Sequence, residues 1–469
     1  MTSAPPPSPA VLLATSCAFI IVQLDVTIVN VALPRIGLEL DAGLSDLQWV
    51  VDAYTLGFAV FLLSAGALGD RFGSRRVFLA GFALFAAASV GCALAPLAWV
   101  LNAARALQGI GAALLVPSSL AILNASYAHD KALLAKAVGW WTAAGGVSIA
   151  AGPVLGGVLL SLAGWRSIFW VNVPICAAAF WLARATLTPA PPLAQPLAGA
   201  PARRPFDVPG QLLAIVALTA LIGAVIEVQA LGAGHALVRA AALLALLAGA
   251  AFIAVERRSA APMLPLQLFH QPGFGAAVLF GVLVNFAYYG VIFVLSFYLQ
   301  TVRHFSALDS GLMFLPLTAT FIVSNIASGA MSARTGLRAP MIVGGLIACA
   351  GYALLALRGI SADAGFLDML PGLVLIPAGM GLAVPAMTTS ILAGTGRHQA
   401  GTASAVLNTA RQVGGAVGVA VFGALAAGES PVDMIAGIRA ATVIAAMLLL
   451  AAATLAYRCR VGAPARVPA

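Results

Sequence analysis

The chain has 469 residues, of which 62% are hydrophobic and only 8% are charged, and its formal net charge is +9. This composition excludes a protein that folds in water, because a soluble monomer cannot hide so much apolar surface. About fourteen apolar runs are long enough to form membrane-spanning helices, so the sequence predicts an all-α integral membrane protein. The positive charge follows alternate loops, which indicates membrane topology and not a nucleic-acid partner.

The first predicted span, residues 11 to 33, carries an acid near its middle. Asp25 lies in the segment LDVTIVN, where an ionised carboxylate costs about 2.5 to 3.5 kcal/mol on insertion scales. Desolvation favours the protonated form of such a group, so Asp25 is predicted to bind a proton. A structural hydrogen bond to a neighbouring helix is the alternative. The first ten residues contain no Lys or Arg, so we expect this span to be retained and not cleaved as a signal.

The second predicted span, residues 48 to 69, leads into a loop that combines glycines, one acid and several arginines. This loop reads Gly66-Ala-Leu-Gly-Asp70-Arg71-Phe-Gly73-Ser-Arg75-Arg76. The glycines permit a tight turn between two closely packed helices, and the arginines favour the cytoplasmic face.

The fourth predicted span, residues 98 to 122, contains Arg105 and Gln108. They are three residues apart and therefore share one face of the helix. A guanidinium does not lose its proton, so Arg105 needs a partner inside the membrane, and Asp25 is the simplest choice. We predict that proton arrival at Asp25 releases this pair and couples protonation to helix movement. A static salt bridge is the alternative.

The fifth predicted span, residues 137 to 161, contains a helix breaker surrounded by small residues. Proline removes one backbone hydrogen bond, and glycines permit bending and close contact. This pattern predicts a hinge between two halves of the protein, with rigid glycine packing as the alternative. The predicted hinge residues are Gly152, Pro153, Gly156 and Gly157.

The rest of the chain repeats the first part after an insertion. A Pro/Ala-rich linker at 188 to 205 precedes two spans, and Asp207-Val-Pro209 predicts the start of the first of them. The loop motif returns 263 residues later as Gly329 to Arg338, with Ala333 in place of the acid, and adding 263 to residue 11 gives 274, the start of the ninth span. Two parallel six-helix repeats are the architecture of the major facilitator fold. We therefore predict fourteen membrane-spanning helices, in three regions: an N-terminal six-helix bundle (1–187), a linker with two inserted helices (188–258) and a C-terminal six-helix bundle (259–469).

Polar and aromatic side chains inside the spans are candidates for a substrate cavity, although most aromatic residues in spans pack or face lipid. The candidates are Asp52, Tyr54, Gln108, Trp141, Asn285, Tyr289, Asn408 and Arg411. The sequence has no histidine or cysteine pattern for a metal and no GxxxxGK[ST] loop for ATP. We expect no cofactor, and energy from an ion gradient. The central carboxylate favours protons, with sodium as the alternative.

Several segments together resemble the fourteen-span drug:proton antiporter family of the major facilitator superfamily. They are Asp25 to Pro34, the loop Gly66 to Arg76 with Ser74 at a usually basic position, the fourth-span residues Leu101, Arg105, Gln108, Gly109 and Gly111, and the fifth-span residues Gly139 and Gly152 to Gly157, with Ser148 at a usual glycine. The resemblance implies alternating access and export. It also implies that Asp25 and Arg105 couple protons, and that a cytoplasmic latch is formed by Gly66, Asp70, Arg71, Gly73 and Arg75.

The sequence therefore predicts a proton-coupled exporter of amphiphilic drugs, antibiotics or other toxic compounds. It is expected to be a multi-pass protein of the cytoplasmic membrane with both termini in the cytoplasm, because the alternate loops on that side hold most of the Lys and Arg residues. An importer or a dedicated metabolite exporter is one alternative. A non-transporting receptor or a membrane-embedded enzyme is another, but the sequence offers no nucleophile with an adjacent base.

Overall fold

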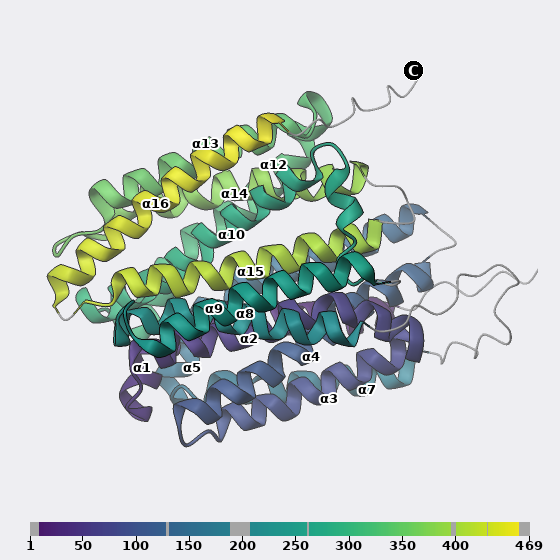
Figure 1. Cartoon of the computed structure of the whole chain (residues 1–469), viewed down its shortest axis with the longest axis horizontal. Helices are drawn as coiled ribbons and strands as arrows, with labels where there is room; N and C mark the ends of the chain where they lie inside the picture. The colour runs from purple at the N-terminus through teal and green to yellow at the C-terminus, as the bar shows by residue number, and fades with distance from the viewer. Residues whose placement is uncertain are drawn as a thin grey trace, which may run out of the picture.

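The computed structural model describes residues 9–127, 131–187, 207–259, 262–394, 400–428 and 430–458. Every regular element within these ranges is a helix, and the long helices run side by side along one axis (Figure 1). The α-helices are α1 (Pro9–Leu40), α2 (Leu44–Phe72), α3 (Ser74–Ala93), α4 (Ala98–Tyr127), α5 (Lys131–Ala163), α6 (Ser167–Trp170), α7 (Asn172–Thr186), α8 (Val208–Leu231), α9 (Ala236–Arg258), α10 (Phe274–Phe297), α11 (Ala307–Met313), α12 (Leu315–Thr335), α13 (Arg338–Leu354), α14 (Phe366–Gly394), α15 (Ala400–Ala426) and α16 (Pro431–Arg458).

The helices of the described ranges have the length and composition of membrane spans. Twelve of them pass as single spans, and the two bent parts of α5 together make a thirteenth. The all-helical membrane architecture predicted from the sequence is confirmed. The presence of fourteen membrane-spanning helices stays a prediction.

The helices pack in a pattern that occurs twice along the chain. In the first half, α1 packs on α5, α2 on α4, and α3 on both α4 and α7. In the second half, α10 packs on α15, α12 on α14, and α13 on both α14 and α16. Each helix therefore has the same neighbours as its counterpart in the other half, as a duplicated six-helix unit requires. The exact boundaries at 187 and 258 stay predictions, and the predicted linker at 188 to 205 lies outside the described residues.

The repeated loop has a similar glycine backbone conformation in both halves, and in both an arginine of the loop hydrogen-bonds to the end of another helix. Gly73 and Gly336 are 263 residues apart (336 − 73 = 263) and have φ angles of 89° and 77°, which glycine adopts most readily. Arg75 donates to the Arg184 carbonyl at the end of α7 (3.0 Å), and Arg338, also 263 positions later, donates to the Tyr457 carbonyl at the end of α16. In each half an arginine thus binds the free carbonyls of the last helix.

The two halves meet through α2 against α15 and through α5 against α11 and α12. Some of these contacts lie at the end of the bundle that is expected to face outward, which we call the outer end. There Gln300 donates to the Val31 carbonyl (3.0 Å), and Gln48 donates to the Ala420 carbonyl (2.9 Å). Gly157 of α5 packs so closely on α11 that a methyl group on it would lie 2.8 Å from the Ala307 carbonyl oxygen. The outer end is therefore closed between the halves.

The hinge segment predicted in the fifth span coincides with a bend in the helix axis. The two parts of α5, Lys136–Ile149 and Ala151–Ala163, differ in direction by 44°. Pro153 causes such a bend because it has no N–H to donate to the carbonyl four residues earlier. Movement at this bend stays a prediction.

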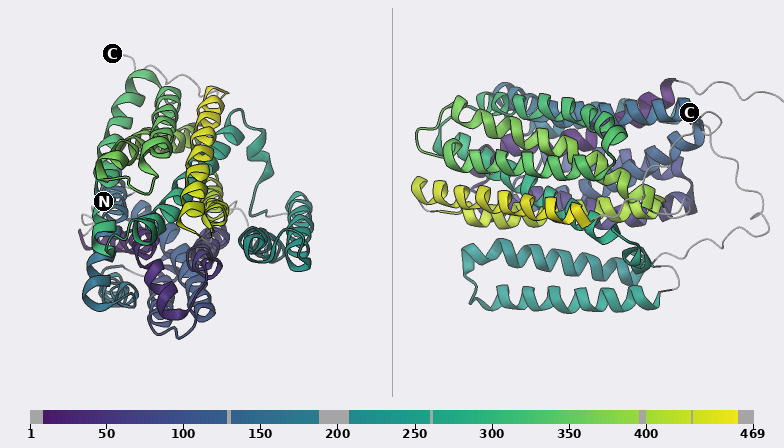
Figure 2. Two further views of the ribbon diagram at one scale, coloured as in Figure 1. Left: turned by 90° about the vertical axis from the view of Figure 1, so that its left-hand side faces the viewer. Right: turned by 90° about the horizontal axis from the view of Figure 1, so that it is seen from above.

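The inserted helices α8 and α9 form a hairpin beside the two bundles (Figure 2). Asp207 accepts a hydrogen bond from the Gly210 N–H (2.9 Å), which confirms the helix start predicted there. α8 contacts α2 and α15. The Ser64 hydroxyl donates to the Gln211 side-chain oxygen near one end of this contact, and the Ser45 hydroxyl donates to Glu227 near the other (2.7 Å). The hairpin is thereby held to α2 at two levels.

Candidate functional site

Asp25 lies at the centre of a buried polar cluster inside the first half. Its side chain is 0% exposed, and one carboxylate oxygen accepts a hydrogen bond from the Arg105 guanidinium of α4. The other oxygen accepts from the Gln108 amide (2.9 Å) and from the Asn172 amide of α7 (3.1 Å). The carboxylate is therefore held by three donors on two neighbouring helices.

Arg105 is equally well satisfied. Besides Asp25, it donates to the Gln108 side-chain oxygen (2.7 Å) and to the Val50 carbonyl of α2 (2.9 Å). The ring of Tyr54 lies 4.3 Å from the centre of the guanidinium, which is within range for a cation–π contact. Both carboxylate oxygens of Asp25 and the Nε and Nη1 groups of Arg105 thus have hydrogen-bond partners, as a buried charged pair in the membrane requires.

Gln108 joins the cluster to a further helix. Its amide nitrogen donates to the Ser89 hydroxyl of α3 (2.8 Å) as well as to Asp25. The cluster thus connects α1, α3, α4 and α7 and contacts α2. A change in the charge of Asp25 would alter the hydrogen bonds of five helices together.

Asp52 of α2 is the second acid deep inside the bundle, and its surroundings are different. Its side chain is 0% exposed, and neither carboxylate oxygen forms a hydrogen bond with any residue that the structure describes. One turn away, Leu56 packs with Ile222 of α8 and Ala416 of α15. A carboxyl group buried in this way is more stable in its neutral form.

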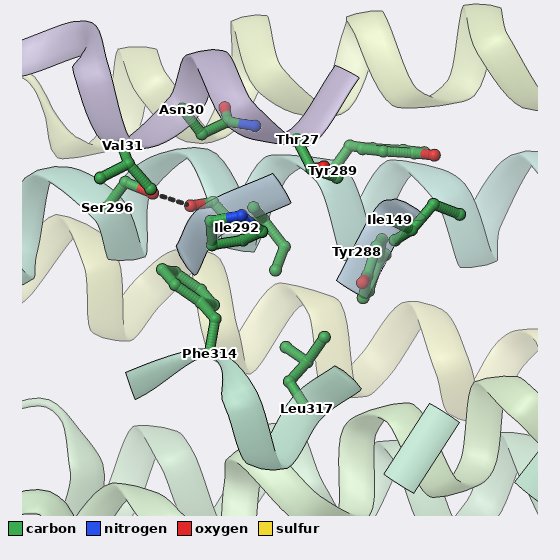
Figure 3. Close-up of a pocket in the computed structure, with 11 residues that line it drawn as sticks. Thr27, Asn30, Val31, Ile149, Tyr288, Tyr289, Ile292, Ser296, Phe314 and Leu317 are labelled. Atoms are coloured by element: carbon green, nitrogen blue, oxygen red, sulfur yellow. Dashed lines mark hydrogen bonds between the residues drawn. The ribbon is translucent and has the colours of Figure 1, made fainter. Parts of the chain in front are cut away.

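A small pocket lies between the halves, on the opposite side of α1 from Asp25. Its polar lining comes from Thr27, Asn30, Tyr288, Tyr289 and Ser296, and its apolar lining includes Ile149, Pro153, Ile292, Phe314 and Leu317 (Figure 3). Successive helical residues are about 100° apart, so Asp25 and Thr27 point in roughly opposite directions. α1 therefore presents one face to the charged pair and the other to the pocket.

The predicted cavity residues are not gathered in one place. Tyr289 lines the pocket, whereas Tyr54 and Gln108 belong to the Asp25 cluster. Trp141 stacks on Phe19 and donates to the Thr15 carbonyl (3.2 Å), away from the pocket-lining residues. Two further residues, Asn285 and Asn408, donate to carbonyls of their own helices, and Arg411 lies on α15 without a hydrogen-bond partner in the described ranges.

The predicted latch is described only in part. The backbone of Asp70 lies in the last turns of α2, but its side chain is outside the described part of the structure. Gly66 and Arg71 are exposed on the same helix. Gly73 forms the turn, and Arg75 binds the end of α7.

Several residues of the cluster and the pocket were missed by the sequence-based site prediction. Asn172 and Ser89 complete the Asp25 cluster, while Thr27 and Asn30 line the pocket. Among the described residues, no group of three His, Cys, Asp or Glu side chains has the geometry of a metal site.

Comparison with solved structures identifies the fold. The crystal structure of the POT family transporter PepTSo matches with a TM-score of 0.68 at 14% sequence identity, over 97% of this chain and 98% of that one. The inward-open conformation of the xylose transporter XylE from E. coli matches with a TM-score of 0.65 at 14% identity, over 97% and 96% of the two chains. At this level of identity the likeness concerns the fold alone.

Relatives found by sequence share a much higher sequence identity with this chain than the solved structures do. The methylenomycin A resistance protein of Bacillus subtilis is 38% identical over 89% of this chain and 87% of its own length. The multidrug resistance protein Stp of Mycobacterium tuberculosis is 37% identical, and the tetracenomycin C resistance and export protein of Streptomyces glaucescens is 36% identical; each match covers 89% of this chain and 75% of the relative. These relatives are transporters and not enzymes.

The family model for the Major Facilitator Superfamily matches residues 15–419, which include the Asp25 cluster, the pocket and the repeated loop. With this match, and with drug-resistance exporters among its relatives, the chain belongs to the major facilitator superfamily of membrane transporters.

Proposed function

We propose that this protein is a proton-coupled antiporter that exports amphiphilic small molecules across the cytoplasmic membrane, with both termini in the cytoplasm. The observation that carries the proposal is the fully buried Asp25–Arg105 pair, fixed by Gln108 and Asn172. A side chain in this position that gains or loses one proton changes the balance of charge inside the membrane.

The geometry of α1 supports a route from protonation to substrate movement. When a proton neutralises Asp25, its attraction to Arg105 weakens and the hydrogen bonds around it rearrange. α1 carries Asp25 on one face and the pocket residues Thr27 and Asn30 on the other. A shift of this helix therefore changes the pocket as well, and the bend in α5 beside it supplies the predicted hinge.

Asp52 offers a second carboxyl group for a proton. It lies on α2, the helix that packs on α15 across the two halves, and no described residue donates a hydrogen bond to it in this closed interface. Opening of the interface to water would favour the ionised form, so the proton balance of Asp52 would change with the conformation. Export is supported by the relatives, whose names include drug resistance and export.

The test uses purified protein in liposomes with an imposed pH gradient, acid on the side of the outer end. The compounds are methylenomycin A, tetracenomycin C and a panel of lipophilic dyes. We expect the wild-type protein to move at least one compound toward the acid side. Asp25→Asn should insert normally but lose gradient-driven movement, whereas the matched control Asp363→Asn, at an exposed loop acid, should behave as wild type. Unchanged transport by Asp25→Asn would refute the proton site.

A further inference from the structure

Arg411 is a permanent positive charge inside the second half, and no described residue serves as its counter-ion. It lies eleven residues after the start of α15, about 16 Å along the helix. Its guanidinium forms no ion pair or hydrogen bond with any residue in the described ranges, and its Nε atom is buried. Arg105, inside the first half, has three partners. An unpaired charge inside the membrane is costly and marks a functional position.

The surroundings of Arg411 belong to the neighbourhood of the pocket. Its side chain packs on Gly281 of α10, and one turn further along α15, Gly415 packs on the ring of Tyr289. Tyr289 and its neighbour Tyr288 line the pocket, and neither hydroxyl is hydrogen-bonded to a described residue.

The buried acids of the first half do not balance the charge of Arg411. None of the residues that line the pocket is charged. Asp25 is neutralised by Arg105 within the first half, and Asp52 forms no ion pair with Arg411. The pocket thus has free tyrosine hydroxyls between apolar walls, and the charge of Arg411 lies outside its lining, one helical turn from Gly415, which packs on Tyr289.

We propose that Arg411 and Tyr289 bind the carboxylate of an anionic amphiphile at the contact between α10 and α15. A guanidinium binds a carboxylate through two parallel hydrogen bonds and is weakly hydrated, so it suits this role in an apolar site. The inference rests on the proposed export function and narrows its substrates to apolar compounds with one negative charge. A membrane potential that is negative inside favours the exit of such an anion.

The test measures binding by titration calorimetry in detergent, without a pH gradient. Three probes share one naphthalene ring: 2-naphthoate, its neutral methyl ester, and the cation 2-naphthylmethylammonium. Wild-type protein should bind the carboxylate about tenfold more tightly than the ester, and the ammonium most weakly. Arg411→Gln should abolish this preference, and Arg411→Lys should retain part of it. The matched control Arg358→Gln, at an exposed arginine, should keep the wild-type preference.

Three results would overturn the inference: no binding of 2-naphthoate to the wild type, equal or tighter binding of the ester or the ammonium, or an Arg411→Gln variant that keeps the preference. The first two results come from the wild-type protein alone, so they do not depend on whether a variant folds. Wild-type protein that selects the carboxylate but shows no transport in a pH gradient would refute the proposed antiport alone. Wild-type protein that transports without any preference for charge would refute the role of Arg411 alone.

Discussion

Two buried acids in the first half illustrate how one residue type is used in two ways. Asp25 has three hydrogen-bond donors, one of them charged, whereas Asp52 has none among the described residues. Removal of a partner from a buried ion pair leaves an uncompensated charge, while replacement of an unpaired polar group by an apolar one removes a desolvation cost.

This contrast predicts opposite effects of the same substitution. Asp25→Leu should lower stability by about 3 to 5 kcal/mol, because Arg105 is left as an unpaired buried charge. Asp52→Leu should be neutral or stabilising by about 1 to 3 kcal/mol. Thermal unfolding of both variants in detergent measures the difference. A large loss of stability in Asp52→Leu would mean that its carboxyl group has a partner.

At the scale of helices, the contact between α5 and α11 determines how closely the outer end can shut. Gly157 lies against the α11 backbone, so an added methyl group would be 2.8 Å from both the Ala307 oxygen and Leu308 Cα. Backbone atoms cannot move aside as a flexible side chain can. The smallest possible side-chain addition should therefore separate the two helices.

We predict that Gly157→Ala favours opening of the outer end. The measurement is the rate at which a membrane-impermeant maleimide, added from outside, labels a cysteine introduced at Asn30 in the pocket, relative to the parent protein. The rate should rise several-fold. Gly139→Ala is the matched control on the same helix, because a methyl group there meets nothing within 4 Å. Equal rates in the two variants would show that this contact does not hold the outer end shut.

The repeated loop predicts a matched pair of effects at the other end of the bundle. Arg75 and Arg338 occupy the same position in the repeat and bind the ends of α7 and α16. Arg75→Ala and Arg338→Ala should each lower stability by about 1 to 2 kcal/mol, since each removes a charged hydrogen-bond donor. Calorimetric unfolding checks this, and a loss in only one variant would argue against equivalent roles.

At the scale of the whole molecule, the sequence was sufficient for the helical membrane architecture because composition and charged breaks mark the spans directly. Asp25 and Arg105 were predictable as partners because a lone charge in a span needs another. Asn172, Thr27 and Asn30 were not predicted as site residues. α1 is apolar over most of its circumference, so its pattern does not reveal which face meets α4 and which meets the pocket. That information exists only once the helices are packed.

The packed structure also divides the predicted cavity into two parts with different charges. The first half contains the neutralised Asp25–Arg105 pair, and the second half contains Arg411, which has no ion-pair or hydrogen-bond partner among the described residues. Duplication thus produced two similar bundles, one of which holds the titratable acid while the other holds the fixed positive charge. In the proposed cycle, the first half takes up the proton and the second half binds the substrate.

The most direct test of this account is whether substrate movement alone drives protons in the opposite direction. Liposomes that contain the purified protein and a pH-sensitive dye are prepared with equal pH on both sides and a gradient of a compound transported in the assay above. The account predicts proton flux opposite to the substrate, lost in Asp25→Asn and retained in Asp363→Asn. Substrate movement without proton flux, or with protons moving in the same direction, would contradict it.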